Sequence, residues 1–165
     1  MTPAEQRFIT GLKIANLKEG WDRKIIYVHA YHETGGFKRV VGLNNYWGLK
    51  PPKNWTGKVV EVITTEFVKG NTIPPEFKNK VLSYEQAGEY LKLKIRDYFI
   101  DFDNAKDSIE YYENFIQRVY PQAFAVRSDY KAYYNALVSG KLKYATDPKY
   151  PEKLIRLYET IKGDF

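Results

Sequence analysis

The chain has 165 residues, of which 44% are hydrophobic and 16% aromatic, and it carries a formal net charge of +6. This length fits one domain with a sizeable core, and the composition excludes a disordered polymer. The sequence contains no run of about 18 apolar residues, so no membrane span is predicted. The first residues lack the order of a secretory signal, in which basic residues precede apolar ones. The absence of cysteine excludes disulfides. The positive charge favours an anionic partner, without choosing between nucleic acid, acidic lipid and cell-wall polymer.

Two helices are predicted in the first part of the chain. Thr2-Pro3-Ala4-Glu5 combines a capping threonine, a proline at the first helical position and a glutamate three residues after the cap, so a helix should begin there. A second helical stretch follows Asp22 and ends at Gly35-Gly36. Glu33 is therefore expected in the last turn of a helix.

The middle of the chain predicts an ordered loop and a small β-hairpin. Residues 37–58 contain glycines, prolines and aromatic residues, which is typical of a loop. Residues 59–68 are β-branched and aromatic and predict a strand, after which Lys69-Gly70-Asn71 offers a turn, so we expect a β-lobe at about residues 58–78. Alternation along the strand places Thr64 and Glu66 on the face opposite to Glu61.

The second half of the chain is predicted to be helical. Ser83 with Gln86 forms a capping box ahead of an apolar stripe that extends to Tyr98. Residues 109–119 form another helical face, Ser128 is expected to cap a further helix, and Asp147-Pro148 should open the last one. The prediction is one mostly helical α+β domain over residues 1–165, with a small β-hairpin lobe.

Glu33 is the candidate acid catalyst. The negative end of the helix dipole disfavours the ionised form of a carboxyl group in the last helical turn, and a carboxyl group that keeps its proton can act as a general acid. Glycoside cleavage usually needs a second carboxylate as well, and Glu66 on the predicted hairpin is the candidate. A solvated glutamate at a helix end and a surface strand residue are the plainer interpretations of these two residues.

His29, His32 and Glu33 share one side of the second helix, which raises the question of a metal site. His29 and His32 are the only histidines in the chain, and a further metal ligand cannot be identified. We therefore expect no metal and no cofactor, and a pair of partly buried helix histidines.

Aromatic residues in the loop are candidates for stacking on a ligand. Such rings bind the C–H faces of sugars, and they also stack on nucleobases. Most tyrosines of the chain are expected in the core or on amphipathic helices, and the groove candidates are Tyr46, Trp47 and Trp55.

Four short blocks then occur in a recognisable order. They are His32-Glu33-Thr34-Gly35-Gly36, Asn45-Tyr46-Trp47-Gly48-Leu49-Lys50, Thr64-Thr65-Glu66-Phe67 and Tyr144-Ala145-Thr146-Asp147-Pro148. With these blocks the chain resembles the autolysin- and flagellar-type β-N-acetylglucosaminidases, which include many phage lysins. It departs from them at Tyr46-Trp47, where relatives usually have Leu-Phe, and at Phe77-Lys78, where they usually have Phe-Arg.

The resemblance implies a lysozyme-like fold in which a helical lobe carries the catalytic glutamate. It implies Glu33 as proton donor, Glu66 as second carboxylate and Tyr144 as a tyrosine beside the cleft, with the N-acetyl group of the substrate as an alternative to Glu66. Asp147 is expected to have a structural role. The substrate-binding candidates are Asn45, Tyr46, Trp47, Trp55 and Thr64.

The expected function is that of a peptidoglycan hydrolase, an endo-β-N-acetylglucosaminidase that cuts the β-1,4 bond between N-acetylglucosamine and N-acetylmuramic acid without a cofactor. The alternatives are a muramidase or lytic transglycosylase of similar fold and a non-catalytic cell-wall-binding module. We expect a monomer that binds peptidoglycan, neither binds nucleic acid nor inserts into a membrane, and acts on the bacterial cell wall after phage- or prophage-type release or another route of export.

Overall fold

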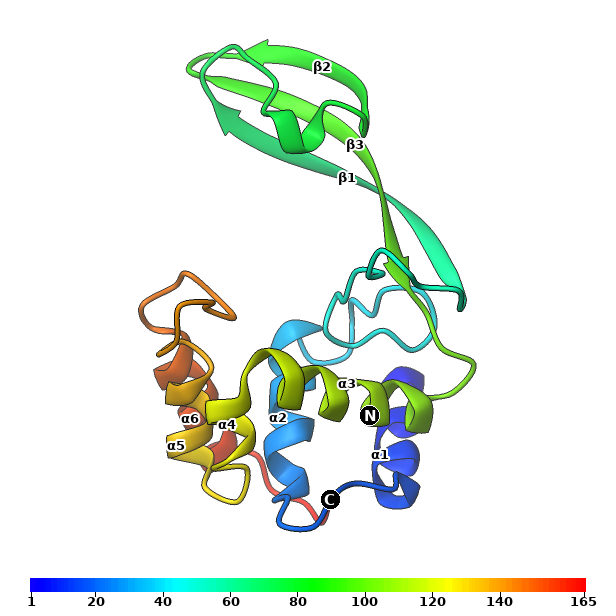
Figure 1. Cartoon of the computed structure of the whole chain (residues 1–165), viewed down its shortest axis with the longest axis vertical. Helices are drawn as coiled ribbons and strands as arrows, with labels where there is room; N and C mark the ends of the chain where they lie inside the picture. The colour runs from blue at the N-terminus through cyan, green and yellow to red at the C-terminus, as the bar shows by residue number, and fades with distance from the viewer. The chain divides into compact units, whose positions relative to one another are not determined.

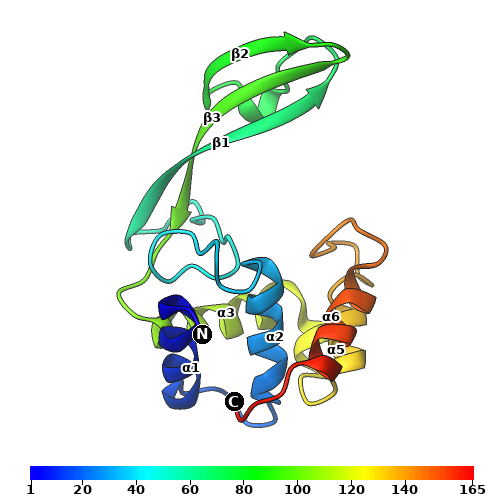
Figure 2. The ribbon, with the colours of Figure 1, turned by 180° about the vertical axis from the view of Figure 1, so that it is seen from behind.

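The computed structural model describes residues 1–165 as two compact units. Residues 1–48 and 102–165 form a helical unit, and Leu49–Asp101 forms a sheet unit. Figures 1 and 2 show the ribbon from two opposite sides. The mixed α+β fold class is confirmed, whereas a single domain over the whole chain stays a prediction.

The helical unit contains six α-helices. In both ribbon views α2 lies between α1 and α6, while α3 crosses one side of the unit (Figures 1 and 2). None of the helices combines the length and apolar character needed to cross a bilayer. Their bounds are α1 (Pro3–Ile14), α2 (Arg23–Glu33), α3 (Ala105–Val119), α4 (Pro121–Phe124), α5 (Tyr130–Ala136) and α6 (Tyr150–Thr160).

The predicted start of α1 and the predicted start and end of α2 are confirmed. The Thr2 hydroxyl accepts a hydrogen bond from the backbone N–H of Glu5, whose carboxylate accepts from the Thr2 N–H, so the capping box is complete. Asp22 caps α2 through the N–H of Lys24. After Glu33 the chain turns through Gly35 and Gly36 at φ of 59° and 74°, conformations that favour glycine.

A close approach of α1 and α3 anchors the core of the helical unit. A Cβ atom on Gly11 would lie 2.7 Å from Ala105 Cβ and 2.8 Å from the backbone nitrogen of Lys106, so only glycine fits there without movement. Apolar residues of these two helices and of the other helical segments fill the interior beside this contact. Fully buried members include Phe8, Leu12, Ile25, Ile26, Val28, Ile109, Ile116, Leu137 and Leu154.

Two helix starts in the second half differ from the prediction. Asp129 rather than Ser128 caps α5, through the N–H of Ala132. Asp147 does not begin α6 directly, because its side chain and carbonyl accept the N–H groups of Lys149 and Tyr150 in the turn before the helix. This turn supports the structural role expected for Asp147.

The sheet unit is an antiparallel sheet with strand order β1-β3-β2. The strands are β1 (Val59–Lys69), β2 (Val81–Ala87) and β3 (Tyr90–Ile100), and the short 3-10 helix η1 (Pro75–Phe77) lies in the connection after β1. The central strand β3 pairs with β1 from Val59 opposite Ile100 to Lys69 opposite Tyr90.

The predicted helix over residues 83–98 is wrong, and so is the predicted hairpin partner of β1. Residues 83–98 form most of β2, most of β3 and the turn between them, in which Gly88 has φ 61°. Gln86 donates to the carbonyls of Gly88 and Tyr90 instead of capping a helix. The β-lobe therefore extends well beyond the predicted residues 58–78, because the partner of β1 comes after the turn at Gly88.

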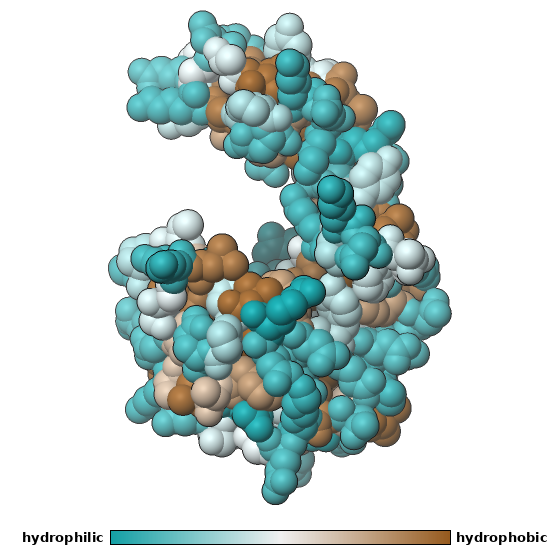
Figure 3. All heavy atoms as spheres, in the orientation of Figure 1, coloured by the Kyte–Doolittle hydropathy of each residue, from teal (hydrophilic) through white to brown (hydrophobic).

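One face of the sheet carries its own apolar core. Leu91, Leu93 and Ile95 of β3 are buried, and the partly buried Val68, Ile73, Phe77 and Val81 pack against them. The register places Thr64 opposite Ile95 and Glu66 opposite Leu93, which confirms that Thr64 and Glu66 share a face. Apolar side chains also stand among hydrophilic ones on the surface in Figure 3, and exposed examples of this unit are Ile63, Phe67 and Tyr84.

Candidate active site

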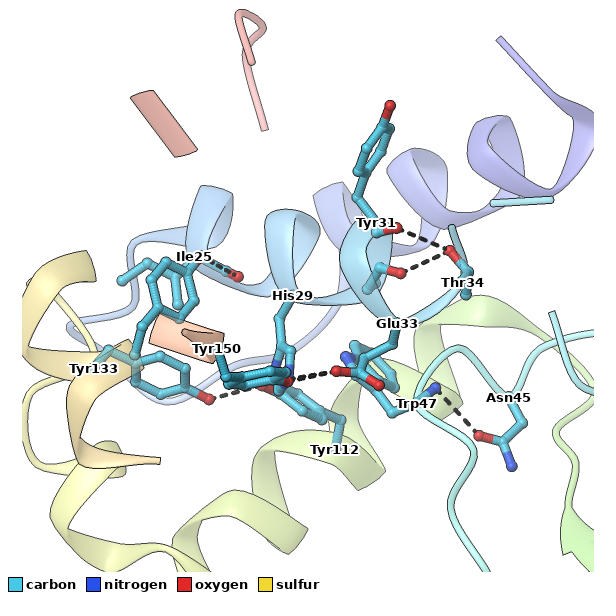
Figure 4. Close-up of polar contacts among 12 residues, drawn as sticks. Ile25, His29, Tyr31, Glu33, Thr34, Asn45, Trp47, Tyr112, Tyr133 and Tyr150 are labelled. Atoms are coloured by element: carbon cyan, nitrogen blue, oxygen red, sulfur yellow. Dashed lines mark hydrogen bonds and ion pairs between the residues drawn. The ribbon is translucent and has the colours of Figure 1, made fainter. Parts of the chain in front are cut away.

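Glu33 is the last residue of α2, and its carboxyl group is the centre of the candidate site. Its side chain is 25% exposed, so the group is half-buried at the unit's surface. The hydroxyl group of Tyr150 donates a hydrogen bond to Oε1 of Glu33 (Figure 4). Oε2 makes no hydrogen bond within the protein, so one carboxyl oxygen is held and the other is free.

His29 lies one helical turn before Glu33 and is completely buried. Its Nδ1 is 2.5 Å from the hydroxyl oxygen of Tyr112, and its Nε2 is 2.8 Å from that of Tyr150. Burial lowers the pKa of His29 to about 3, with a smaller contribution from His32, so the imidazole is neutral at physiological pH.

Buried tyrosine hydroxyls extend these contacts into the core. The hydroxyl oxygens of Tyr112 and Tyr133 are 2.7 Å apart. Burial raises the pKa of Tyr112, of Tyr133 and of Tyr150 far above the ordinary value, and for Tyr150 the charge of Glu33 adds to this effect. These hydroxyls therefore stay protonated and act as hydrogen-bond donors and acceptors.

Tyr144 packs against His29 and Tyr150, the two residues that lie next to the Glu33 carboxyl group. Its ring contacts His29 with centroids 4.6 Å apart and stacks loosely on Tyr150 at 6.0 Å. Burial and then the charge of Glu33 raise the pKa of Tyr144 well above its ordinary value. The Tyr144 hydroxyl makes no hydrogen bond within the protein, which leaves it available to a ligand.

Three predicted substrate-binding residues of the loop are buried instead. Tyr46 is 1% exposed and packs edge-on against Phe8, and Trp47 is 5% exposed and stacks on Tyr112. Asn45 is buried as well, and its Oδ1 accepts the N–H of Trp47. The prediction that these side chains line an open groove is wrong, because the loop folds its aromatic rings onto the core of the helical unit.

The remaining predicted residues belong to the sheet unit. Trp55 is half-buried and donates its indole N–H to the carbonyl of Lys58. Thr64 is half-buried on β1, while Glu66 is exposed and makes no hydrogen bond or ion pair. Their roles in catalysis and substrate binding stay predictions.

The histidines of α2 do not form a metal site with Glu33. Both ring nitrogens of His29 are hydrogen-bonded to tyrosine hydroxyls, so neither is free for a metal ion. His32 is half-buried, and its ring contacts Tyr150. No group of three or more acidic, histidine or cysteine side chains is arranged to hold a metal ion.

Tyr150, which holds the candidate acid, could not be singled out from the sequence. Tyr150 is the third residue after Asp147 and begins α6, so it lies just beyond the block Tyr144–Pro148. The spacing of His29 and Glu33 places both residues on one side of α2, but the sequence does not indicate that His29 contacts tyrosines. The pairing of His29 with tyrosines 83 and 121 residues away depends on the fold.

A half-buried carboxyl group with one oxygen held and the other free is suited to proton donation, which is the step that glycoside hydrolases require of an acidic side chain. Residues 11–163 match the Glucosaminidase family, described as mannosyl-glycoprotein endo-beta-N-acetylglucosaminidase. The chain therefore belongs to this family, and the resemblance seen in its sequence is confirmed.

Known relatives agree with this assignment. The chain is 25% identical over 159 residues to the peptidoglycan hydrolase FlgJ of Salmonella typhimurium and to FlgJ of Escherichia coli K12, covering 92% of this chain and 43% and 44% of theirs. It thus spans less than half the length of these relatives. A crystal structure of a peptidoglycan hydrolase mutant from Sphingomonas sp. A1 is 25% identical, with a TM-score of 0.59 over 94% of this chain and 86% of that one. The glycoside hydrolase domain of Salmonella FlgJ, at 24% identity, shares the fold with a TM-score of 0.63 over 94% and 93% of the two chains.

Proposed function

We propose that this protein is a peptidoglycan hydrolase, an endo-β-N-acetylglucosaminidase with Glu33 as its general acid, and that both units act as one catalytic domain. The observation that carries the proposal is the asymmetry of the Glu33 carboxyl group. Oε1 accepts from Tyr150, whereas Oε2 has no partner in the protein. A proton on Oε2 is therefore the one that can pass to a substrate.

In the proposed reaction Glu33 gives this proton to the bridging oxygen as the bond from that oxygen to C1 of N-acetylglucosamine breaks. Water then adds to C1, and its proton returns to a carboxylate. The products are a strand with a reducing N-acetylglucosamine end and a strand beginning with N-acetylmuramic acid. Half-burial of Glu33 against the Tyr150 hydroxyl supports this role, because it holds the carboxyl group in one position at the surface of the unit.

Tyr144 and Glu66 are the proposed partners of Glu33. The free hydroxyl group of Tyr144 lies beside the acid and is suited to hydrogen-bond the sugar at the cleaved bond. Glu66 is exposed and unpaired, so its carboxylate is available to activate water, with the N-acetyl group of the substrate as the alternative. Trp55 and Thr64 remain proposed substrate contacts of the sheet unit.

The proposed substrate and place of action follow from the family and its named relatives. Peptidoglycan strands in the bacterial cell wall are the target, and the net charge of +6 favours binding to an acidic wall. We propose action as a monomer, with delivery by phage- or prophage-type release or by another export route.

Product analysis on purified peptidoglycan tests the proposal. Mass spectrometry should find new reducing N-acetylglucosamine ends, and Glu33→Gln, which keeps the size of the side chain but removes the acid, should lower kcat by roughly 10²- to 10⁴-fold. Glu19→Gln is the matched control, because Glu19 is an exposed glutamate of the same unit, and it should retain full activity.

Other products would overturn the proposal in distinguishable ways. Reducing N-acetylmuramic acid ends would identify a muramidase, and anhydro-muramyl ends a lytic transglycosylase. Binding to peptidoglycan with no new ends would identify a wall-binding module. Undiminished cleavage by a folded Glu33→Gln variant would exclude Glu33 as the acid.

A further inference from the structure

A continuous chain of hydrogen bonds joins the candidate acid to the interior of the helical unit. It passes from Oε1 of Glu33 to Tyr150, to Nε2 and then Nδ1 of His29, to Tyr112 and finally to Tyr133 (Figure 4). The four residues behind Glu33 come from α2, α3, α5 and α6 and are all buried. The geometry of this chain restricts where its hydrogens can lie.

Each link has only one hydrogen to give. A neutral imidazole carries one N–H and one bare nitrogen, and each tyrosine hydroxyl donates once. Because Tyr150 donates to Oε1 of Glu33, its oxygen must accept from His29, so the imidazole proton lies on Nε2. Nδ1 is then bare and accepts from Tyr112, whose oxygen accepts from Tyr133.

We propose that His29 is a positioning residue whose Nε2–H tautomer fixes the Tyr150 hydroxyl as a donor to Oε1 of Glu33, so that the transferable proton of Glu33 resides on Oε2. This inference rests on the proposed role of Glu33 as the acid. His29 does not touch the substrate. It acts through Tyr150, and Tyr112 holds it in the required tautomer.

The opposite order of hydrogens gives a different site. With the proton on Nδ1, His29 would donate to Tyr112, and Tyr150 would donate to the bare Nε2. Oε1 of Glu33 would then lose its donor and become a favoured position for the acid proton, facing Tyr150 rather than a substrate. The tautomer of His29 therefore distinguishes an acid whose proton is available from one whose proton points inward.

Nitrogen-15 NMR of the intact protein at pH 7 measures this tautomer directly. The chain has only two histidines, and a His32→Gln variant assigns the signals of His29. We expect a protonated Nε2 and a bare Nδ1 in His29. A proton on Nδ1, or on both nitrogens, would overturn the proposal. This measurement needs no substrate, so its outcome is independent of whether the protein cleaves peptidoglycan.

A matched pair of tyrosine variants tests the effect on catalysis. Tyr112→Phe removes the donor to Nδ1, whereas Tyr134→Phe removes an equally buried hydroxyl that donates to the carbonyl of Ile25 outside the chain of hydrogen bonds. We expect Tyr112→Phe to lower kcat roughly tenfold with KM unchanged, the effect of one lost hydrogen bond on the barrier.

Tyr134→Phe should leave both kcat and the tautomer as they are in the wild-type protein. Equal losses of kcat in the two variants would show that the hydrogen-bonded tyrosines act only through core packing, and would overturn the positioning role of His29. If the wild-type protein leaves peptidoglycan intact, the proposed function fails, while the tautomer still decides the hydrogen-bond order.

Discussion

The indole ring of Trp47 stacks on the ring of Tyr112, with centroids 4.0 Å apart and planes 11° apart. The hydroxyl group of Tyr112 bonds to Nδ1 of His29, one turn from Glu33. Trp47 therefore supports the residues behind the acid by packing, although its position in a motif loop suggested contact with substrate.

Trp47→Ala should lower the free energy of unfolding by about 3–5 kcal/mol, the usual effect of deleting a buried large aromatic side chain. Trp47→Phe keeps a ring against Tyr112 and should cost much less. Urea denaturation measures both changes. KM should be unchanged in Trp47→Phe, and a raised KM without a loss of stability would instead indicate that the indole binds substrate.

Two glutamates of β1 offer a paired test of the second carboxylate. Glu66→Gln should lower kcat by about 10²-fold, the lower range for acid–base groups, and should leave stability unchanged because Glu66 has no partner. Glu61 accepts from Tyr98 and pairs with Arg96 at 3.1 Å. Glu61→Gln should therefore leave kcat unchanged and cost less than about 1 kcal/mol, as exposed ion pairs do. Full activity of Glu66→Gln would transfer the role to the substrate's N-acetyl group.

Asp97 gives the sheet unit a predictable dependence on pH. Burial alone would raise the pKa of Asp97, but hydrogen bonds from Lys50 at 2.6 Å and Lys80 at 3.1 Å, and from the Tyr98 N–H, outweigh it and hold the pKa below its ordinary value of 3.8. The ionised form is thus favoured by folding. Its contribution is present above the unfolded pKa and is lost as pH falls through the lower folded pKa.

Asp97→Asn should therefore lower the free energy of unfolding at pH 7 by about 1–3 kcal/mol, the range for hydrogen bonds to charged groups. The difference from the wild-type protein should shrink as pH falls below about 4. Denaturant titrations at pH 7, 5 and 3 measure it, and Asp164→Asn, an exposed aspartate, is the control. A difference that is constant with pH would show that charge is not its cause.

Gly11 tests the close contact of α1 and α3. Alanine is a better helix former than glycine by about 1 kcal/mol, but the added Cβ would lie 2.7 Å from Ala105 Cβ, and overpacking typically costs about 1–3 kcal/mol. Because backbone also lies within 2.8 Å, the contact cannot relax cheaply, and Gly11→Ala should destabilise the protein. Thr10→Ala, exposed on the same helix, should be neutral or stabilising. A stabilised Gly11→Ala would contradict the tight packing.

The parts of the fold that the sequence predicted correctly depend on local chemistry. The capping box at Thr2, the cap at Asp22 and the glycines after Glu33 act within a few residues, so α1, α2 and the position of Glu33 could be predicted. The sheet could not be completed in the same way, because the partner of β1 lies after an intervening strand.

The error over residues 83–98 had a visible signal. Leu91, Leu93 and Ile95 alternate with basic residues in the two-residue period of a strand, and Gly88 followed by Glu89 fits a two-residue turn. The apparent capping box at Ser83 and Gln86 favours a helix and so conflicts with the two-residue period of a strand. The burial of Tyr46 and Trp47 had no local signal, since ring position within a loop is decided by distant core residues such as Tyr112.

The buried tyrosines also limit how this protein can be engineered for heat resistance. Replacing Tyr112 or Tyr133 by leucine or phenylalanine would make the interior more apolar. It would also remove hydroxyl groups that are connected to Glu33 through His29. Such variants would leave buried hydrogen-bond partners unsatisfied and would turn over more slowly. Screens for more stable variants should therefore leave these buried hydroxyl groups unchanged and target exposed side chains instead.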